Sequence, residues 1–431
     1  MNYRETLDWL FSQLPMYQRI GAAAYKSDLG NTLALLSEQG NPQTRFPSVH
    51  IAGTNGKGSV AHLLTAILQE AGYRTGLYTS PHLTDFRERI RIQGAMIQEE
   101  AVMKYVSRYR SAFRHIQPSF FEMTVGMAFD HFSREKVDIA VIETGMGGRL
   151  DSTNVIHPEV SIITNIGHDH QRFLGNDLPS IAKEKAGIIK SGVPVVLGKM
   201  PEELLPVFRQ KATEMQAPLF LSEKEVRLHN AHLLKGAERL LVFDADHPLY
   251  GRMKKIACPL ASIVQLENLA SVLTALIPLH EDFPVDVAAL FQGIRNVKKT
   301  TGLRGRWEIL STSPLIVADT AHNPEGLKAG MEQWMRCPAA DRHLVFGMAE
   351  DKDPYALLSL LPADADYYFC KPAVERGMPA EKVRDAARSL GLKGQAWASV
   401  QEAFENAKTQ VSPSGSIYVG GSTFVVAEII L

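Results

Sequence analysis

The sequence contains few cysteines and no surplus of either charge. Its three cysteines, Cys258, Cys337 and Cys370, are far apart and form no C-x-x-C pair, which argues against a disulfide framework and against a zinc site. With 46 basic and 47 acidic residues, the chain lacks the positive surface that nucleic acid or an anionic membrane would require. We therefore expect small-molecule partners, no nucleic acid, no membrane and reduced thiols.

The chain also has no hydrophobic run long enough to span a membrane. No segment approaches the ~18 consecutive apolar residues of a membrane-spanning helix. Near the N-terminus, Arg4, Glu5 and Asp8 interrupt the apolar run that a signal peptide would need. We therefore expect a cytoplasmic protein.

What the sequence does contain is the alternation of strands and helices that is typical of α/β proteins. Segments of helical periodicity separate short β-branched runs, which lie at 48–52, 75–79, 137–142, 160–166 and 193–198. A more β-like, charged stretch from about 219 to 265 interrupts this pattern. A second series of strands follows a basic, glycine-containing segment near residue 298.

Chain length favours two domains, because 431 residues exceed the ~250–300 at which a single hydrophobic core stops growing. We predict an α/β protein with a P-loop-containing, mostly parallel sheet domain at 1–297. A smaller, Rossmann-like α/β domain is predicted at 298–431.

Polar residues follow several of the predicted strands at the point where each strand ends. They are Gly53 to Ser59, Ser80, Glu143, Asp169 with His170, and Asp319 with His322 and Asn323. In open α/β sheets, ligands collect beyond the carboxyl ends of the strands. This distribution predicts one active site assembled from many strand ends.

The segment GTNGKGS at 53–59 is almost a Walker A phosphate loop. In the usual loop a hydroxyl residue directly follows the lysine, whereas here Gly58 follows Lys57 and the hydroxyl comes later, at Ser59. A strand precedes the loop and an amphipathic helix follows it, so backbone N–H groups and the helix N-terminus can hold phosphates. The alternative is a glycine-rich turn with a surface lysine.

Glu143 and His170 are candidate metal ligands. Glu143 ends an apolar strand and offers the hard oxygen that Mg²⁺ prefers, although a capping or salt-bridged glutamate is the alternative. His170 belongs to GHDH, directly after a strand, where a loop histidine with ordinary partners explains it equally well. Imidazole is an uncommon ligand for Mg²⁺.

Lys185 is a candidate reactive amine. In the helix DLPSIAKEKAGIIK it shares one face with Ile181 and with Ile188 or Ile189, whereas Lys183 and Lys190 fall elsewhere. A lysine in such a position either extends its charged end to water or has its pKa lowered by desolvation, which makes the neutral amine reactive.

Two residues of the predicted second domain are candidate ligand contacts. Arg306 in LRGRWE could neutralise phosphate charge, and Asp319 in VADTAHNPEG could hold ribose, an amine or a metal. Structural salt bridges would explain either residue equally well.

The chain resembles the folylpolyglutamate synthase/dihydrofolate synthase family, a branch of the Mur-ligase-like ATP-dependent amide ligases. The motifs that carry the resemblance occur in the family's order and cover nearly the whole chain: GTNGKGS, TSPHL, FFEMT, ETGMGGRLDSTN, GHDHQRFLG, IAKEKAGIIK and DTAHNPEG. The delayed hydroxyl is then this family's version of the phosphate loop. The chain departs from the family pattern at LASIVQLEN, with Ser262 and Val264, and at DTAHN in place of an aspartate-glycine version.

The resemblance implies a role for each matching position. It implies metal ligands at Ser80, Glu143, His170 and a carboxylated Lys185, and catalytic groups at Lys57, Lys185, His170 and Arg306. It implies nucleotide contacts at Thr54, Asn55, Gly56, Lys57, Gly58, Ser59, Asn268, Arg306 and Asp319. It implies substrate contacts at Ser119, Phe120, Phe121, Glu122, Leu150, Asp151, Ser152 and His322.

The implied reaction uses ATP and two Mg²⁺ ions to join L-glutamate to a folate or to dihydropteroate. The γ-phosphoryl group moves to a substrate carboxylate, and the glutamate amine then displaces phosphate from the acyl phosphate. We expect a monomer whose domains close to exclude water from that intermediate. The alternatives are a Mur-type amino-acid ligase of cell-wall precursors and a nucleotide-binding switch without ligase activity.

Overall fold

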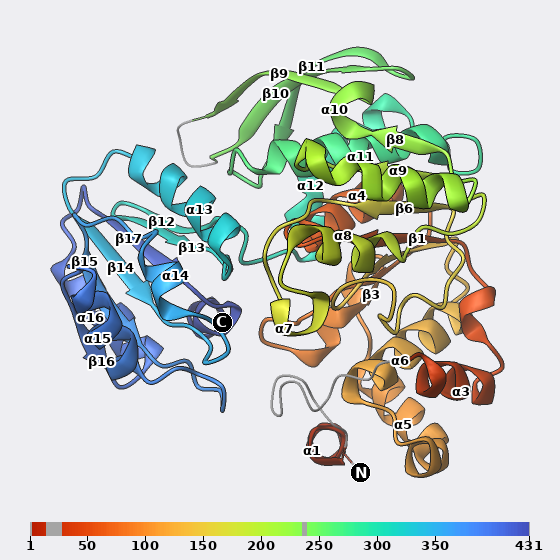
Figure 1. The fold of residues 1–431 in the computed structure, drawn as a ribbon, viewed down its shortest axis with the longest axis horizontal. Helices are drawn as coiled ribbons and strands as arrows, with labels where there is room; N and C mark the ends of the chain where they lie inside the picture. The colour runs from red at the N-terminus through yellow and green to blue at the C-terminus, as the bar shows by residue number, and fades with distance from the viewer. Residues whose placement is uncertain (1, 14–27, 235–238, 431) are drawn as a thin grey trace. The chain divides into compact units, whose positions relative to one another are not determined.

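The structure is a computed structural model that describes residues 2–13, 28–234 and 239–430 (Figure 1). The chain divides into two compact units. The N-terminal unit comprises Met1–His232, Val242–Pro259 and Gln265–Gly302, and the C-terminal unit comprises Leu233–Leu241, Leu260–Val264 and Leu303–Leu431. The boundary expected at residue 298 lies inside helix α12 (Val287–Thr301), shortly before this division.

The N-terminal unit is built on an eight-stranded sheet with the order β4-β3-β2-β5-β1-β6-β7-β8. Six neighbouring strands pair in parallel, in the order β2, β5, β1, β6, β7 and β8. Strands β3 and β4 add an antiparallel edge beside β2. Every residue of β1, β5 and β6 is buried, as expected for strands covered on both faces. The bounds are β1 (Ser48–Ala52), β2 (Thr75–Tyr78), β3 (Ile90–Ile92), β4 (Ala95–Met96), β5 (Ile139–Glu143), β6 (Val160–Ile163), β7 (Val195–Leu197) and β8 (Leu219–Leu221).

Two groups of helices cover this sheet. Helix α4 (Lys57–Glu70) packs against β1, β2 and β5 and also contacts α11 (Gln265–Leu279) and α12. Helix α6 (Phe120–Arg134) packs on the part of the sheet that carries Tyr78 and Ile142, whereas α8 (Leu178–Ala186) and α9 (Leu205–Glu214) pack near Ala52 and Leu197.

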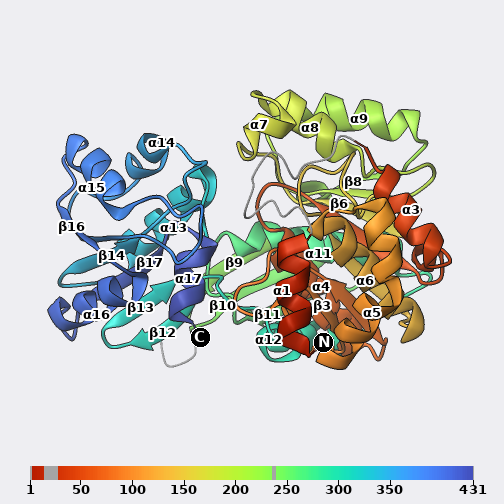
Figure 2. The ribbon, with the colours of Figure 1, turned by 90° about the horizontal axis from the view of Figure 1, so that it is seen from below.

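Further helices extend the layer around α6. Figure 2 shows α1, α3 and α5 grouped beside α6, and the four helices share one apolar cluster with β2 and β5. The remaining bounds are α1 (Tyr3–Gln13), α3 (Gly30–Glu38), α5 (Glu99–Ile116), α7 (Gln171–Leu174), α10 (Ser222–Glu225), and the 3-10 helices η2 (Pro42–Thr44), η3 (Phe86–Arg89) and η4 (Glu202–Leu204).

The β-like stretch after residue 219 forms a separate three-stranded sheet. Its strands are β9 (Arg227–Leu233), β10 (Leu241–His247) and β11 (Gly251–Cys258), with β10 in the centre, and β11 contacts α12. This sheet interrupts the alternation of strands and helices without adding to the phosphate-loop sheet.

The C-terminal unit has a six-stranded sheet with the order β12-β13-β17-β14-β15-β16. All pairs are parallel except β12 with β13, which is antiparallel and irregular between Ile309 and Ser311. The predicted smaller α/β domain is confirmed. Its bounds are β12 (Glu308–Thr312), β13 (Leu315–Ala318), α13 (Pro324–Arg336), β14 (Arg342–Phe346), α14 (Pro354–Leu358), β15 (Asp366–Cys370), α15 (Ala380–Ser389), β16 (Gly394–Trp397), α16 (Val400–Gln410), β17 (Ser416–Gly420) and α17 (Thr423–Ile429).

Among the described residues, no helix is both long enough and apolar enough to cross a membrane.

Candidate active site

The phosphate-loop segment connects β1 to α4 through two glycines that no other residue could replace without strain. Gly56 precedes the helix with φ 85°, and a Cβ atom there would lie 2.1 Å from Asn268 Oδ1. Gly53 has φ 150°, and its Cβ would lie 1.8 Å from Thr164 Oγ1. The sequence places glycine at these positions because the backbone passes within contact of other side chains.

Substituting Gly56 by alanine is expected to destabilise the protein more than the same substitution at Gly72. Gly72 has φ 95°, and a Cβ added there would have no neighbouring atom within 4 Å, so Gly72→Ala tests only the left-handed backbone. That cost is about 1–2 kcal/mol, and Gly56→Ala adds the collision with Asn268. Urea unfolding of both variants measures the difference, and equal losses would contradict the role of close approach.

Hydrogen bonds hold the loop against the segment that follows β6. The Thr54 hydroxyl accepts from Gly167 N at 2.9 Å, and Asn55 N donates to Asn165 Oδ1 at 2.8 Å. Asn55 O accepts from Thr164 Oγ1 at 2.6 Å. These bonds join the loop after β1 to the segment after β6.

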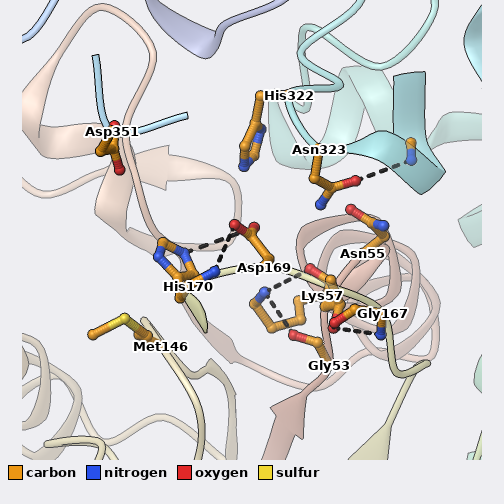
Figure 3. Close-up of polar contacts among 12 residues, drawn as sticks. Gly53, Asn55, Lys57, Met146, Gly167, Asp169, His170, His322, Asn323 and Asp351 are labelled. Carbon is orange, nitrogen blue, oxygen red and sulfur yellow. Dashed lines mark hydrogen bonds and ion pairs between the residues drawn. The ribbon is translucent and has the colours of Figure 1, made fainter. Parts of the chain in front are cut away.

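Two lysines donate to one carbonyl oxygen of this loop. Lys57 Nζ lies 2.9 Å from Gly53 O and 3.1 Å from Thr54 O. Figure 3 shows the Lys57 side chain turned toward Gly53. Lys185 Nζ, from α8, lies 2.8 Å from the same Gly53 O. The structure therefore brings together the two lysines that the sequence singled out.

Lys185 is buried with only 3% of its surface exposed, as its place on the apolar side of α8 predicts. Burial and the neighbouring charge of Lys57 lower the pKa of Lys185 from 10.5 to about 7, while Asp169 and Asp151 oppose that shift. The amine is thus substantially neutral near pH 7, which an exposed lysine is not.

Gly148 of the segment ETGMGGRLDSTN and Gly187, which follows α8, allow the segment to lie directly against this helix. A Cβ on Gly148 would lie 2.9 Å from Glu184 O, and a Cβ on Gly187 would lie 2.4 Å from Arg149 Cα. The GMGG run therefore serves the packing of this loop on the helix that carries Lys185.

Glu143 and Ser80 meet at the ends of β5 and β2. The Ser80 N–H donates to Glu143 Oε2 at 3.1 Å, and only 4% of Glu143 is exposed. The Glu143 carboxylate and the Ser80 hydroxyl are hard oxygen donors by type, as Mg²⁺ prefers, and the hydrogen bond between the two residues is made by the Ser80 backbone. The donor chemistry fits the predicted ion.

His170 is the residue before the short helix α7, with φ 51°, and donates its backbone N–H to Asp169 Oδ1 (Figure 3). Its Nε2 lies 3.8 Å from Asp169 Oδ2. Among the described residues, no group of three or more His, Cys, Asp or Glu side chains is arranged to hold a metal by itself. Any ion here would depend on serine, lysine-derived or ligand oxygens as well.

The segment SFFE, from Ser119 to Glu122, has a larger structural role than the sequence suggested. Ser119 caps α6 and forms a reciprocal capping box with Glu122, which is 3% exposed. Phe120 is buried in the apolar cluster around α6. Phe121 is the half-buried member, and its ring lies directly against Gly145, whose Cβ would come within 2.4 Å of the ring.

Leu150, Asp151 and Ser152 follow the GMGG run. Leu150 is half-buried, whereas Asp151 and Ser152 are 5% and 8% exposed. The Asp151 carboxylate accepts from Met146 N at 2.8 Å and from Thr153 N at 3.0 Å. Burial raises the pKa of Asp151, and these hydrogen bonds oppose that shift. The Asp151 carboxylate therefore holds the backbone of this loop on both sides of its own position.

Arg89 is a buried residue beside this region that the sequence reasoning did not single out. Its Nε donates to His82 Nδ1 at 2.7 Å, and its guanidinium lies 5.5 Å from the centre of the Phe120 ring. Burial and the charge of Arg89 lower the pKa of His82 to about 3. The sequence signal was that DFRERI places arginines between its apolar residues. Only the fold shows that Arg89, and not Arg87, is the buried one.

The nucleotide candidates divide between the two units. In the N-terminal unit, Asn268 lies beside Gly56 and donates to Gln265 Oε1 at 2.8 Å. In the C-terminal unit, Asp319 accepts from Trp307 N and Ala321 N, each at 2.8 Å. Burial raises the pKa of Asp319, and the charge of Arg306 opposes that shift.

His322 and Asn323 follow Asp319 at the start of α13. His322 Nδ1 lies 2.9 Å from Thr320 O, and Asn323 caps the helix by accepting from Gly326 N at 3.0 Å (Figure 3). The end of β13 thus gathers Asp319, His322 and Asn323 within one unit.

Comparison with known proteins decides the family. The chain is 32% identical over 100% of its length to the folylpolyglutamate synthase of Lacticaseibacillus casei, of which it covers 98%. The chain belongs to the folylpolyglutamate synthase/dihydrofolate synthase family. Residues 51–275 match the Mur ligase middle domain, and residues 305–423 match the Mur ligase, glutamate ligase domain.

Solved structures of this family share the fold. A structure described as Escherichia coli FolC in complex with DHPP and ADP aligns with 100% of this chain and 97% of its own, with TM-score 0.86 and 28% identity. The chain also spans 50% of a Haloferax volcanii relative named as a probable bifunctional folylpolyglutamate synthase/dihydropteroate synthase, with 31% identity over 99% of the chain. The predicted family and fold class are confirmed.

Proposed function

We propose that this chain is an ATP-dependent amide ligase that joins L-glutamate to the carboxylate of a folate, of dihydropteroate, or of both. ADP and phosphate are the other products. The observation that carries the proposal is the convergence of Lys57 and Lys185 on the Gly53 carbonyl at the end of β1. The similarity to folylpolyglutamate synthases along the whole chain, and to a FolC structure with DHPP and ADP, supports the substrates.

The reaction proceeds in two steps. The substrate carboxylate attacks the γ-phosphorus of ATP, the bond to the β-phosphate oxygen breaks, and ADP leaves an acyl phosphate. The amine of glutamate then adds to the acyl carbon, a proton is lost, and phosphate leaves with its bonding electrons to give the amide. Water must be excluded while the acyl phosphate exists, because water would hydrolyse it.

The residues of the N-terminal unit are proposed to bind different parts of the substrates. The N-terminus of α4 and the backbone of Thr54 to Ser59 hold the phosphates, and Lys57 offsets charge on the group in transfer. Asn268 lies against the same loop and is proposed to contact the nucleotide. Phe121 and the loop that carries Leu150, Asp151 and Ser152 are proposed to face the pterin.

The residues of the C-terminal unit keep their proposed roles. Arg306 is proposed to offset phosphate charge, Asp319 to contact the nucleotide and His322 to contact substrate. In the N-terminal unit, Ser119, Phe120 and Glu122 are proposed to contact the substrate together with Phe121. Ser119 and Glu122 also cap α6, and Phe120 also lies in the apolar cluster.

Two features of the proposal concern Mg²⁺ and CO₂. Ser80, Glu143, His170 and a carboxylated Lys185 would hold two Mg²⁺ ions, which supply positive charge to the phosphates when bound. Carboxylation would add the neutral Lys185 amine to CO₂ and release a proton, giving a carbamate anion at this buried position.

The substrates are tested by an assay of ADP release. Release should require both a pterin acceptor and L-glutamate, and mass spectrometry should find an acceptor heavier by one or more glutamate residues. Dihydropteroate and tetrahydrofolate tested separately distinguish the two activities. ADP release without either co-substrate would indicate a switch protein, and activity only with a cell-wall nucleotide peptide would indicate another Mur-type ligase.

Glu143→Gln is expected to raise the Mg²⁺ concentration needed for the half-maximal rate. The substitution replaces an anionic hard ligand by a neutral amide of the same shape. A titration of rate against Mg²⁺ at saturating ATP measures the effect, with Glu135→Gln as control because Glu135 is exposed and paired with Arg74. An unchanged titration would assign Glu143 to structure alone.

A further inference from the structure

A chain of hydrogen bonds runs from the centre of the sheet to the loop after β5. His50 lies on β1 and is fully buried, and its Nε2 is 2.8 Å from the hydroxyl of Thr153. The same hydroxyl donates to Asp151 Oδ1. The three side chains join positions that are about a hundred residues apart in sequence.

The direction of every hydrogen bond in this chain follows from chemistry. The Thr153 hydroxyl donates its single proton to Asp151 Oδ1. The Thr153 oxygen must therefore accept from His50, which places the histidine proton on Nε2. A neutral imidazole carries only one proton, so His50 Nδ1 carries none; this nitrogen is buried with no hydrogen-bond partner among the described residues.

The electrostatic surroundings agree with a neutral His50. Burial and the charge of Lys190 lower the pKa of His50 to about 3, and Lys190 itself donates to Asn154 O at 2.9 Å. Neutral imidazole with one defined tautomer can act as a fixed donor over the whole physiological pH range.

Asp151, at the end of these hydrogen bonds, holds the loop that Phe121 touches. Besides the Thr153 hydroxyl, the Asp151 carboxylate accepts from Thr153 N and Met146 N. Met146 is adjacent to Gly145, the residue against which the Phe121 ring lies. A rotation of the Asp151 carboxylate would therefore displace the backbone that supports Phe121.

Packing alone does not explain a histidine at this position. The other residues of the strand SVHIA that share the interior of the sheet are small or apolar, and an apolar residue at position 50 would avoid burying an imidazole. A fully connected buried polar chain fixes orientation in a way that apolar contacts do not.

We propose that His50 and Thr153 are positioning residues that fix the Asp151 carboxylate and, through it, the wall of the pterin site. This inference rests on the proposed function, because it takes the Gly145 to Ser152 loop and Phe121 as the pterin contacts. Neither His50 nor Thr153 takes part in the hydrogen bonds of the phosphate loop that are described above. Their loss should therefore weaken binding of the pterin acceptor and leave the nucleotide chemistry intact.

The test compares Thr153→Val with Thr153→Ser and with a matched control. Thr153→Val keeps the shape and removes the hydroxyl, and we expect the KM for the pterin acceptor to rise about tenfold with kcat and the KM for ATP within about twofold. Thr153→Ser restores the hydroxyl and should return the pterin KM to within about twofold of wild type. Thr301→Val is the control, because Thr301 forms a similar buried threonine–histidine hydrogen bond, with Oγ1 2.7 Å from His62 Nδ1. Its hydroxyl donates to the Val297 carbonyl oxygen and not to a carboxylate.

The outcomes separate this inference from the function on which it rests. Asp151→Asn serves as the reference for loss of the carboxylate. If it raises the pterin KM while Thr153→Val does not, the positioning role is wrong and the proposed pterin site stands. If neither variant changes the pterin KM, the assignment of this loop to the pterin fails as well. Two results would show that the hydrogen bonds from His50 to Asp151 serve stability alone, and would overturn the proposal. One is an equal loss of pterin and ATP affinity in Thr153→Val, and the other is the same rise in pterin KM in Thr301→Val.

Discussion

Lys57→Ala is expected to abolish ATP-dependent ligation while leaving the protein folded. In the structure the Lys57 ammonium turns back on its own loop and donates to the carbonyl oxygens of Gly53 and Thr54. Phosphate oxygens carry more negative charge than these carbonyls, so the ammonium should transfer to the nucleotide when it binds. Loss of one such group lowers kcat by about 10²–10³ in comparable sites.

The fold should tolerate this change because other contacts hold the loop. Thr54 and Asn55 keep their hydrogen bonds to Gly167 and Asn165, and Lys185 still donates to Gly53 O. The measurements are steady-state ADP release, thermal unfolding, and the same assays on Lys183→Ala, an exposed lysine of α8. Activity of Lys57→Ala within about threefold of wild type, far less than the loss expected for a charge aimed at the transferring phosphate, would contradict its role.

Lys185→Ala is expected to lose most of the ligase activity, and acetate is expected to restore part of it. If the functional group at position 185 is a carbamate, the alanine variant leaves space into which a small carboxylate can enter and supply the missing anion. Because the pKa of Lys185 is lowered to about 7, the neutral amine that reacts with CO₂ is present from about neutral pH upward.

Lys185→Arg separates a carbamate from a simple positive charge. Arginine stays cationic and cannot be carboxylated, so this variant should be as impaired as Lys185→Ala. Mass spectrometry under CO₂ and rate measurements in CO₂-depleted buffer complete the test. Normal activity of the arginine variant in CO₂-depleted buffer would show that the amine serves only its hydrogen bond to Gly53.

The strands and the phosphate loop could be predicted from the sequence because their signals are local. A run such as SVHIA followed by glycines and an amphipathic helix specifies a strand, a turn and a helix within about twenty residues. The burial of Lys185 was predictable for the same reason, since helical spacing alone puts it beside Ile181 and away from Lys183.

The SFFE segment shows where the local signal was incomplete. Ser119 and Glu122 are predicted to contact substrate, which stays a prediction. Their three-residue spacing is also that of a capping box, and they form one at the start of α6. Phe120 and Phe121 are adjacent and alike in sequence. Only the packing of α6 on the sheet places the first in the apolar cluster and the second against Gly145.

Local sequence was enough to specify the α/β alternation, the position of the phosphate loop and the lysine on the inner side of α8, because each depends on neighbours within a few turns of chain. Which distant groups meet depended on the tertiary packing. That packing put two lysines on the Gly53 carbonyl, turned Arg89 inward, and connected His50 to Asp151 through Thr153. It also assigned Leu233–Leu241 and Leu260–Val264 to the C-terminal unit. The reason is that such contacts depend on strand order and register, and these are set by the packing of the whole sheet.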